Sequence, residues 1–183
     1  ASILIDFGIE FPVSARMMIW AVHSPNGRAN LRIRFGESVM ETMADIGQKN
    51  ATNDHANRDM IINVGQLSAT ETNESGFRFM RIDLLDDNAA VIFKSIEGIF
   101  IYRDIEYRGS FECDDELVNR IFNTAAYTTH VNMQEYFWEG IKRDRLVWIG
   151  DMNPETLTVN CMYGSIPHVE NSFTFAKEQS PLP

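Results

Sequence analysis

The chain has 183 residues with a formal net charge of −10 at pH 7, and 44% of its residues are hydrophobic. The negative charge argues against a nucleic-acid partner, whose phosphates would be repelled, and no apolar run approaches the ~20 residues that a membrane-spanning helix requires. Four scattered histidines and two distant cysteines form no metal-ligand spacing, so we expect neither a metal nor another cofactor.

The first part of the chain, residues 1–110, is predicted to form an antiparallel β-sandwich domain. Leu31, Ile33 and Phe35 alternate with two arginines, which is the period of a strand with one buried face. Short runs without a helical period between most of them are typical of a sandwich. The predicted strands are residues 3–7, 16–22, 31–35, 60–64, 77–84, 91–96 and 99–102.

Residues 37–58 are polar and are predicted to form a long loop with one helical turn. Loops of this length are often functional. The loop offers four polar side chains that could contact a ligand, although a solvated loop is the more common explanation of such residues: Asn53, Asp54, His55 and Arg58.

After residue 111 the hydrophobic period becomes helical, which predicts a second domain over residues 111–183. A first helix is expected at residues 114–132, because six residues share one face at helical spacing: Leu117, Val118, Ile121, Phe122, Ala125 and Thr129. Asn153 as the N-cap and Pro154 as the first helical residue predict a second helix to about residue 163. A third helix is expected at residues 168–178. Three helices cannot easily close a core of their own, so we expect the helical domain to continue beyond the last residue.

Cys113 and Cys161 are expected to be two buried free thiols, although a disulfide between them is also compatible with the sequence. Cysteine usage therefore leaves the compartment open between periplasm and cytoplasm.

The segment 139–151 concentrates charged residues behind the aromatic run Tyr136-Phe137-Trp138. Glycines at both of its ends and Pro154 argue against a continuous helix. An irregular segment between two helices would let Glu139, Asp144 and Asp151 converge on one pocket. Carboxylates, guanidinium groups and flat aromatic rings suit a sugar-cleaving site.

A structural explanation of the same segment is also open. Lys142, Arg143 and Arg145 could neutralise the acids in a surface salt-bridge network, with Trp148 as a core anchor.

The run EGIKRDRLVWIGDMNPE at residues 139–155 resembles the signature of bacterial α-L-rhamnosidases, glycoside hydrolase family 78. Weaker resemblances occur in LRIRFGE (31–37), GFRFMRI (76–82) and GSFECDDEL (109–117). The resemblance implies a β-sandwich followed by the first helices of an (α/α)6 barrel. It also implies inverting hydrolysis of terminal α-L-rhamnosides, and hence a rhamnose-containing glycoside as substrate.

Carried over by position, the resemblance assigns Asp144 as the general acid. It assigns Glu139 and Asp151 to the rhamnose hydroxyls, Trp148 to an aromatic wall, and Arg143 to orienting the carboxylates or a hydroxyl. The chain departs from the family in having Arg-Asp-Arg where Arg-Asp-Glu-Arg is common, and Glu139 where Asp is common.

The family's general base lies downstream of residue 183, in the rest of the barrel. We therefore expect this chain alone to be inactive and to need the remainder of the barrel as its partner. Two other classes remain open on the sequence: a non-catalytic carbohydrate-binding sandwich module, and a purely structural domain that docks on a partner.

Overall fold

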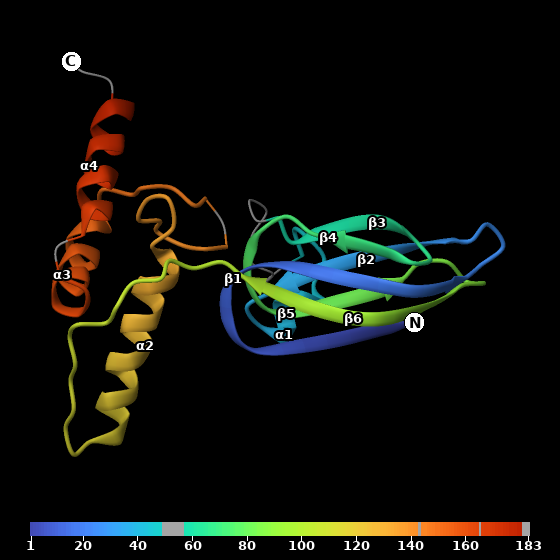
Figure 1. Cartoon of the computed structure of the whole chain (residues 1–183), viewed down its shortest axis with the longest axis horizontal. Helices are drawn as coiled ribbons and strands as arrows, with labels where there is room; N and C mark the ends of the chain where they lie inside the picture. Colours follow the sequence, from blue (N-terminus) through green and yellow to red (C-terminus); the bar gives the residue numbers. More distant parts are fainter. Residues whose placement is uncertain (49–56, 143, 165, 181–183) are drawn as a thin grey trace. The chain divides into compact units, whose positions relative to one another are not determined.

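The computed structural model describes residues 1–48, 57–142, 144–164 and 166–180. The chain divides into two compact units, Ala1–Ile101 and Tyr102–Pro183 (Figure 1). The first unit is rich in β-strands and the second is helical, which confirms the predicted order. None of the helices in the described part has the length and apolar content needed to cross a membrane.

The first unit is one six-stranded antiparallel sheet with the strand order β3-β2-β5-β1-β4, and β6 also pairs with β1. A short helix, α1 (Val39–Met43), follows the second strand and corresponds to the single helical turn expected after residue 37. The strands are β1 (Ser2–His23), β2 (Arg28–Gly36), β3 (Asp59–Gly65), β4 (Ser68–Glu71), β5 (Ser75–Leu84) and β6 (Ala90–Phe100).

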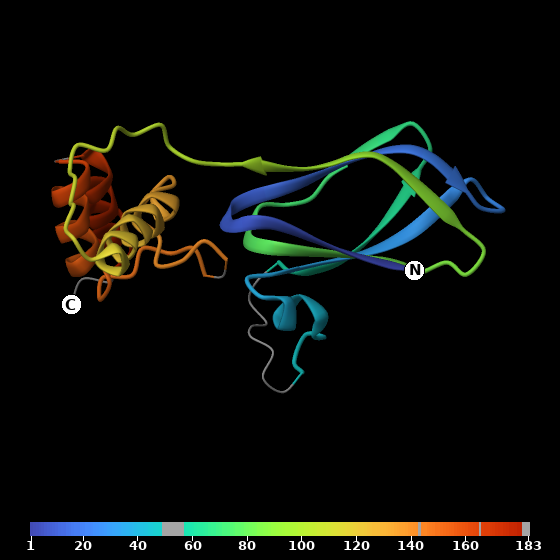
Figure 2. The same cartoon turned by 90° about the horizontal axis from the view of Figure 1, so that it is seen from below.

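The length of β1 explains why the predicted pair of packed sheets is replaced by a single curled sheet (Figure 2). Residues in its first half pair with β5, from Ser2 opposite Asp83 to Val13 opposite Ser75. Residues in its second half pair with β6 and β4. The single strand β1 therefore runs through both halves of the sheet and makes them one continuous sheet.

Two of the predicted strand breaks do not exist. Residues 3–7 and 16–22 lie in the continuous β1, and residues 91–96 and 99–102 largely correspond to β6. Gly8 has a φ of 92° where the register of β1 shifts, so the glycine marks a bulge. Pro12 has no N–H to donate, but its carbonyl accepts a hydrogen bond from Ile101 N–H (3.0 Å), so the residue still joins the sheet through its acceptor.

The interior of this unit is built from aromatic and aliphatic side chains. Phe35 and Phe77 stack with ring centroids 3.9 Å apart, and Phe7 and Phe11 pack around Phe77. Leu31, Ile33 and Phe35 are buried, as the alternation predicted.

Arg34, which this alternation would place toward solvent, is also buried. Its Nη2 donates to Asp83 Oδ2 (3.0 Å), and its Nη1 donates to Asp45 Oδ1 (3.2 Å). Pairing with two carboxylates compensates for removing the guanidinium from water.

The helical unit contains α2 (Glu116–Asn132), α3 (Met152–Met162) and α4 (Pro167–Gln179). Asp115 caps α2, because its carboxylate accepts from Leu117 N–H (2.8 Å) and Val118 N–H (3.4 Å). A small core lies among the helices, formed by Ala126, Met133, Phe137, Met152, Val159, Met162 and Tyr163.

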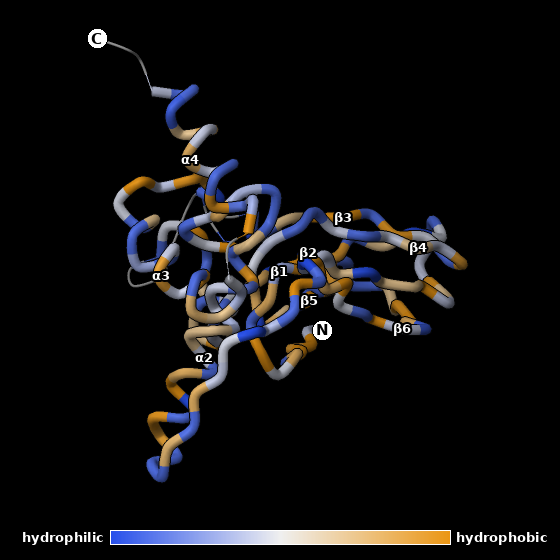
Figure 3. The backbone as a smooth tube through the Cα atoms, turned by 60° about the vertical axis from the view of Figure 1, so that its left-hand side comes forward, coloured by the Kyte–Doolittle hydropathy of each residue, from blue (hydrophilic) through white to orange (hydrophobic). Residues whose placement is uncertain are grey.

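The start of the predicted apolar face of α2 does not enter this core. Leu117 and Ile121 are 55% and 58% exposed, and Figure 3 shows apolar segments in the first turns of α2. The packed side of the helix lies further along, at Ala126 and Val131. Hydrophobic spacing correctly predicted the helix. Which of its residues are buried is determined by the segments that pack against it.

Both cysteines are free thiols, with Cys161 exposed and Cys113 half-buried. The expectation of two buried thiols is therefore wrong.

Candidate functional site

The segment between α2 and α3 is irregular, as predicted, and is anchored at its start. Met133 and Phe137 form an isolated antiparallel bridge. Phe137 is buried, and its N–H donates to Ser172 Oγ in α4 (2.8 Å). Trp138 N–H donates to the carbonyl of Asn132 at the end of α2 (3.0 Å). The aromatic run is therefore attached to two helices before the charged residues begin.

Glu139 is linked to Leu146 by both its backbone and its side chain. Its N–H donates to the Leu146 carbonyl (3.1 Å), and its Oε2 accepts from Leu146 N–H (2.7 Å). The other carboxylate oxygen, Oε1, is buried and has no hydrogen-bond partner among the described residues. A buried carboxylate oxygen without a partner is costly, so it is available to a hydroxyl donor.

Asp144 and Arg145 both have left-handed backbone conformations, with φ of 27° and 50°. Such values are uncommon for residues other than glycine and occur often at functional sites. Asp144 is exposed. The Arg145 guanidinium lies over the Trp138 ring, 5.6 Å from its centroid. Arg143, the remaining basic candidate beside them, lies outside the described residues.

Three carboxylates gather where α3 begins. Burial raises the pKa of Glu155 to about 7, and the negative charges of Asp151 and Glu139 act in the same direction. The structure thus brings together two of the predicted site residues, Glu139 and Asp151, with Glu155 as an unpredicted third. Like charges at close range favour protonation of one member.

Glu155 was not among the residues predicted for the site. Its spacing of four residues from Asp151 was a usable signal, because i,i+4 residues share a helix face. The helix begins at Met152 rather than at Pro154, so the predicted Asn153 N-cap is wrong. Asp151 takes the N-cap position without a side-chain capping bond.

Trp148 is 59% exposed, so it is not the core anchor of the structural explanation. Its carbonyl accepts from Asp151 N–H (3.0 Å), which closes the turn leading into α3. An exposed indole on a turn next to a carboxylate provides a flat apolar surface for a ligand.

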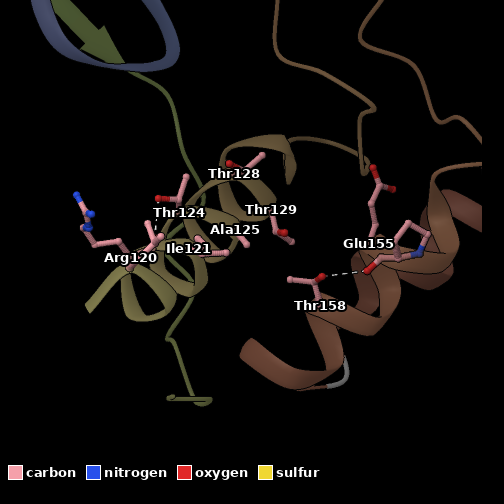
Figure 4. A pocket seen from close by; sticks show the side chains of 10 residues that line it. Arg120, Ile121, Thr124, Ala125, Thr128, Thr129, Glu155 and Thr158 are labelled. Atoms are coloured by element: carbon pink, nitrogen blue, oxygen red, sulfur yellow. Dashed lines mark hydrogen bonds between the residues drawn. The ribbon is translucent and has the colours of Figure 1, made fainter. Parts of the chain in front are cut away.

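A groove of about 700 Å³ separates α2 from α3. In Figure 4, Arg120 to Thr129 line one side and Glu155 and Thr158 line the other. Thr124 and Thr158 donate to carbonyls of their own helices, Arg120 O (2.8 Å) and Pro154 O (3.0 Å). Glu155 is one of the residues that line this groove, and its carboxyl is partly withdrawn from water.

The loop proposed as a sugar-binding element of the sheet unit gains little support. Arg58 is buried, and its Nη1 donates to the carbonyl of Glu41 (3.1 Å), so it is not an exposed contact. Asn53, Asp54 and His55 lie outside the described residues. No group of three or more His, Cys, Asp or Glu side chains in the described part of the chain is arranged to hold a metal ion.

Comparison with known proteins gives a family match for the helical unit and solved structures of similar fold for most of the chain. Residues 106–181 match the model of the bacterial alpha-L-rhamnosidase 6 hairpin glycosidase domain. A rhamnosidase from Klebsiella oxytoca with rhamnose bound has a similar fold, with a TM-score of 0.81 and 21% identity over 94% of this chain. The GH78 rhamnosidase of Bacillus sp. GL1 gives a TM-score of 0.74 and 19% identity over 98% of this chain.

The chain spans 35% of the Klebsiella protein and 18% of the Bacillus protein. No curated protein matches it. The residues of the acidic segment all fall inside the matched range of 106–181. The resemblance of this chain to the bacterial α-L-rhamnosidases, predicted from its sequence, is thereby confirmed.

Proposed function

We propose that this chain is part of a glycoside hydrolase that cleaves terminal α-L-rhamnosides with inversion of configuration. The observation that carries the proposal is the match of residues 106–181 to the rhamnosidase domain, because this range contains the whole acidic segment. In this proposal α2, α3 and α4 are the first helices of an (α/α)6 barrel. The exposed apolar residues of α2 are then a surface on which the remainder of the barrel packs.

Asp144 is the proposed general acid. In an inverting reaction the acid protonates the leaving oxygen while a general base activates water on the opposite face of the sugar. The two carboxyl groups are typically ~6.5–9.5 Å apart to leave room for that water. The exposure of Asp144 supports this role, since the leaving group must reach the acid. The base is expected outside this chain, so the chain alone is inactive.

Glu139, Arg143, Trp148 and Asp151 are proposed to bind the sugar. The bond between the anomeric carbon and the leaving oxygen breaks through a state with positive charge on the ring. The carboxylates gathered at the start of α3 favour such a charge. Trp148, which is exposed, suits the apolar face and methyl group of rhamnose.

The alternative of a surface salt-bridge network is less well supported. Among the described residues no ion pair joins Glu139, Asp151 or Glu155 to a basic side chain. Arg145 contacts an aromatic ring instead. Neighbouring carboxylates without an ion pair carry an electrostatic cost that positive charge developing on the sugar ring would offset.

The test is release of rhamnose from a methyl α-L-rhamnoside, whose leaving oxygen needs a proton, by the longest reading frame that carries this sequence. Replacing a general acid lowers the rate roughly 10²–10⁴-fold, and we expect Asp144→Asn to lose activity in that range. Asp114→Asn, which removes an exposed carboxylate just before α2, is the matched control and should remain active.

The configuration of the first product, followed by NMR, tests inversion separately. A folded parent protein that releases no rhamnose would overturn the proposal, and a product with retained configuration would overturn its mechanism.

A further inference from the structure

The chain returns on itself at the start of the acidic segment through two neighbouring contacts. Glu139 and Leu146 exchange hydrogen bonds of 3.1 Å and 2.7 Å. The residues that precede these two are also in contact. The guanidinium of Arg145 lies over the ring of Trp138, 5.6 Å from the ring centroid. We name these four residues, Trp138, Glu139, Arg145 and Leu146, the loop base.

One side of the loop base is held by the helices. Trp138 N–H is bonded to Asn132 O, and the preceding Phe137 is buried and bonded to Ser172 of α4. The other side has no such support from secondary structure, because residues 144–149 belong to neither a helix nor a strand. Arg145 therefore attaches the irregular side to the anchored side through its contact with Trp138.

Asp144 is the chain neighbour of the residue that makes this attachment. Asp144 and Arg145 both have positive φ, a conformation that L-residues leave unless surrounding contacts maintain it. A cation over an aromatic face and a hydrogen bond to a carboxylate are contacts that can maintain it. If the backbone relaxed to negative φ, the Asp144 carboxyl would leave the chain in a different direction.

We propose that Arg145 is a positioning residue, which directs the carboxyl of Asp144 toward the leaving group by stacking on Trp138. The inference rests on the proposed function, in which Asp144 is the general acid. In this proposal Arg145 positions the general acid instead of neutralising nearby carboxylates, and Trp138 provides the surface on which Arg145 stacks.

The choice of leaving group distinguishes positioning from general structural support. A methyl α-L-rhamnoside needs its leaving oxygen protonated, whereas the 4-nitrophenolate of an aryl rhamnoside leaves with little help. A displaced acid therefore slows the first substrate far more than the second, while a general loss of structure slows both alike.

We expect Arg145→Ala to lower kcat/KM for the methyl rhamnoside about 30-fold and for the 4-nitrophenyl rhamnoside less than about threefold, because a displaced acid forfeits only part of the roughly 10²–10⁴-fold that a general acid contributes. Arg145→Lys keeps the cation but loses the planar face, so its loss should be intermediate. Asp144→Asn combined with Arg145→Ala should lose no more than Asp144→Asn alone, because both changes remove one function.

Arg78→Ala is the matched control. Arg78 also lies over an aromatic ring, that of Phe79 at 4.9 Å, but in the sheet unit. It should leave the ratio of the two rates unchanged. If Arg145→Ala does not fold, as judged by circular dichroism, Arg145→Gly replaces it, because glycine accepts positive φ without strain.

Equal losses on both substrates for the Arg145 variants would overturn the inference. If Asp144→Asn itself shows no dependence on the leaving group, the assignment of the general acid fails instead. The two failures are therefore distinguishable within one set of measurements.

Discussion

Glu155 has an environment that departs from what its position in the sequence suggests. It lies in the first turn of α3, where an acidic residue is normally favourable. Burial, followed by the charges of Asp151 and Glu139, raises its pKa from 4.5 to about 7. Near neutral pH this carboxyl therefore exchanges a proton, while the two neighbours supply negative charge.

This shift predicts a pH-dependent stability. Between pH 4.5 and 7 the folded protein retains a proton that the unfolded chain has released, so the stabilisation is complete below about pH 4.5 and is lost as pH rises through 7. At pH 8 the ionised Glu155 opposes folding. We expect Glu155→Gln to raise the free energy of unfolding by about 1 kcal/mol at pH 8, after allowing for screening of a half-exposed group, and to change it little at pH 5.

The measurement is urea unfolding at the two pH values. Glu112→Gln, at an exposed position before α2, is the matched control and should have no pH-dependent effect. A Glu155→Gln variant whose stability follows the parent at both pH values would show that Glu155 has an ordinary pKa.

At the scale of elements, the strand-to-helix connection depends on one glycine. The N–H groups of Arg108 and Gly109 both donate to the carbonyl of Met162, at 2.7 Å and 3.0 Å, and so attach the connection to the end of α3. A Cβ on Gly109 would lie 2.0 Å from the Cys161 carbonyl oxygen, a backbone atom that cannot rotate away. The close approach therefore requires glycine.

Gly109→Ala is accordingly expected to destabilise the helical unit by about 3 kcal/mol, the upper part of the usual range for overpacking. Thermal unfolding followed by circular dichroism at 222 nm would measure the change. Gly140→Ala is the control, because its added Cβ would meet nothing within 4 Å. Equal stability of the two variants would contradict the close approach at Gly109.

At the scale of the whole chain, the two hydrophobic cores share no residue. The buried cluster of the sheet unit is drawn from residues 11–82, and that of the helical unit is drawn from residues 126–163. Separate cores are the property that lets parts of a chain fold independently.

We therefore expect residues 1–101, expressed alone, to unfold in a single cooperative thermal transition. Phe77→Ala in the same fragment removes a side chain that packs on Phe7, Phe11 and Phe35, and loss of a buried phenylalanine costs about 3–5 kcal/mol. The Phe77→Ala fragment should show little of the cooperative thermal transition. A fragment that shows no transition before the substitution would mean that the sheet needs the helical unit.

Several parts of the fold could be predicted from local patterns. The alternation at Leu31, Ile33 and Phe35 identified a strand and its buried face, and the helical spacing before Asn132 identified α2. Strand boundaries were less predictable. Gly8 and Pro12 normally interrupt strands, yet a bulge and a carbonyl contact accommodate both within β1.

The sequence by itself determined that strands precede helices and that an irregular, carboxylate-rich segment lies between two helices. Periodicity encodes the first, and Gly140, Gly150 and Pro154 encode the second. Only the tertiary structure decided that the sheet curls as one, that Glu155 joins Glu139 and Asp151, and that Arg145 covers Trp138. These contacts form between segments that only the folded chain brings together, and the local spacing of residues carries no information about such contacts.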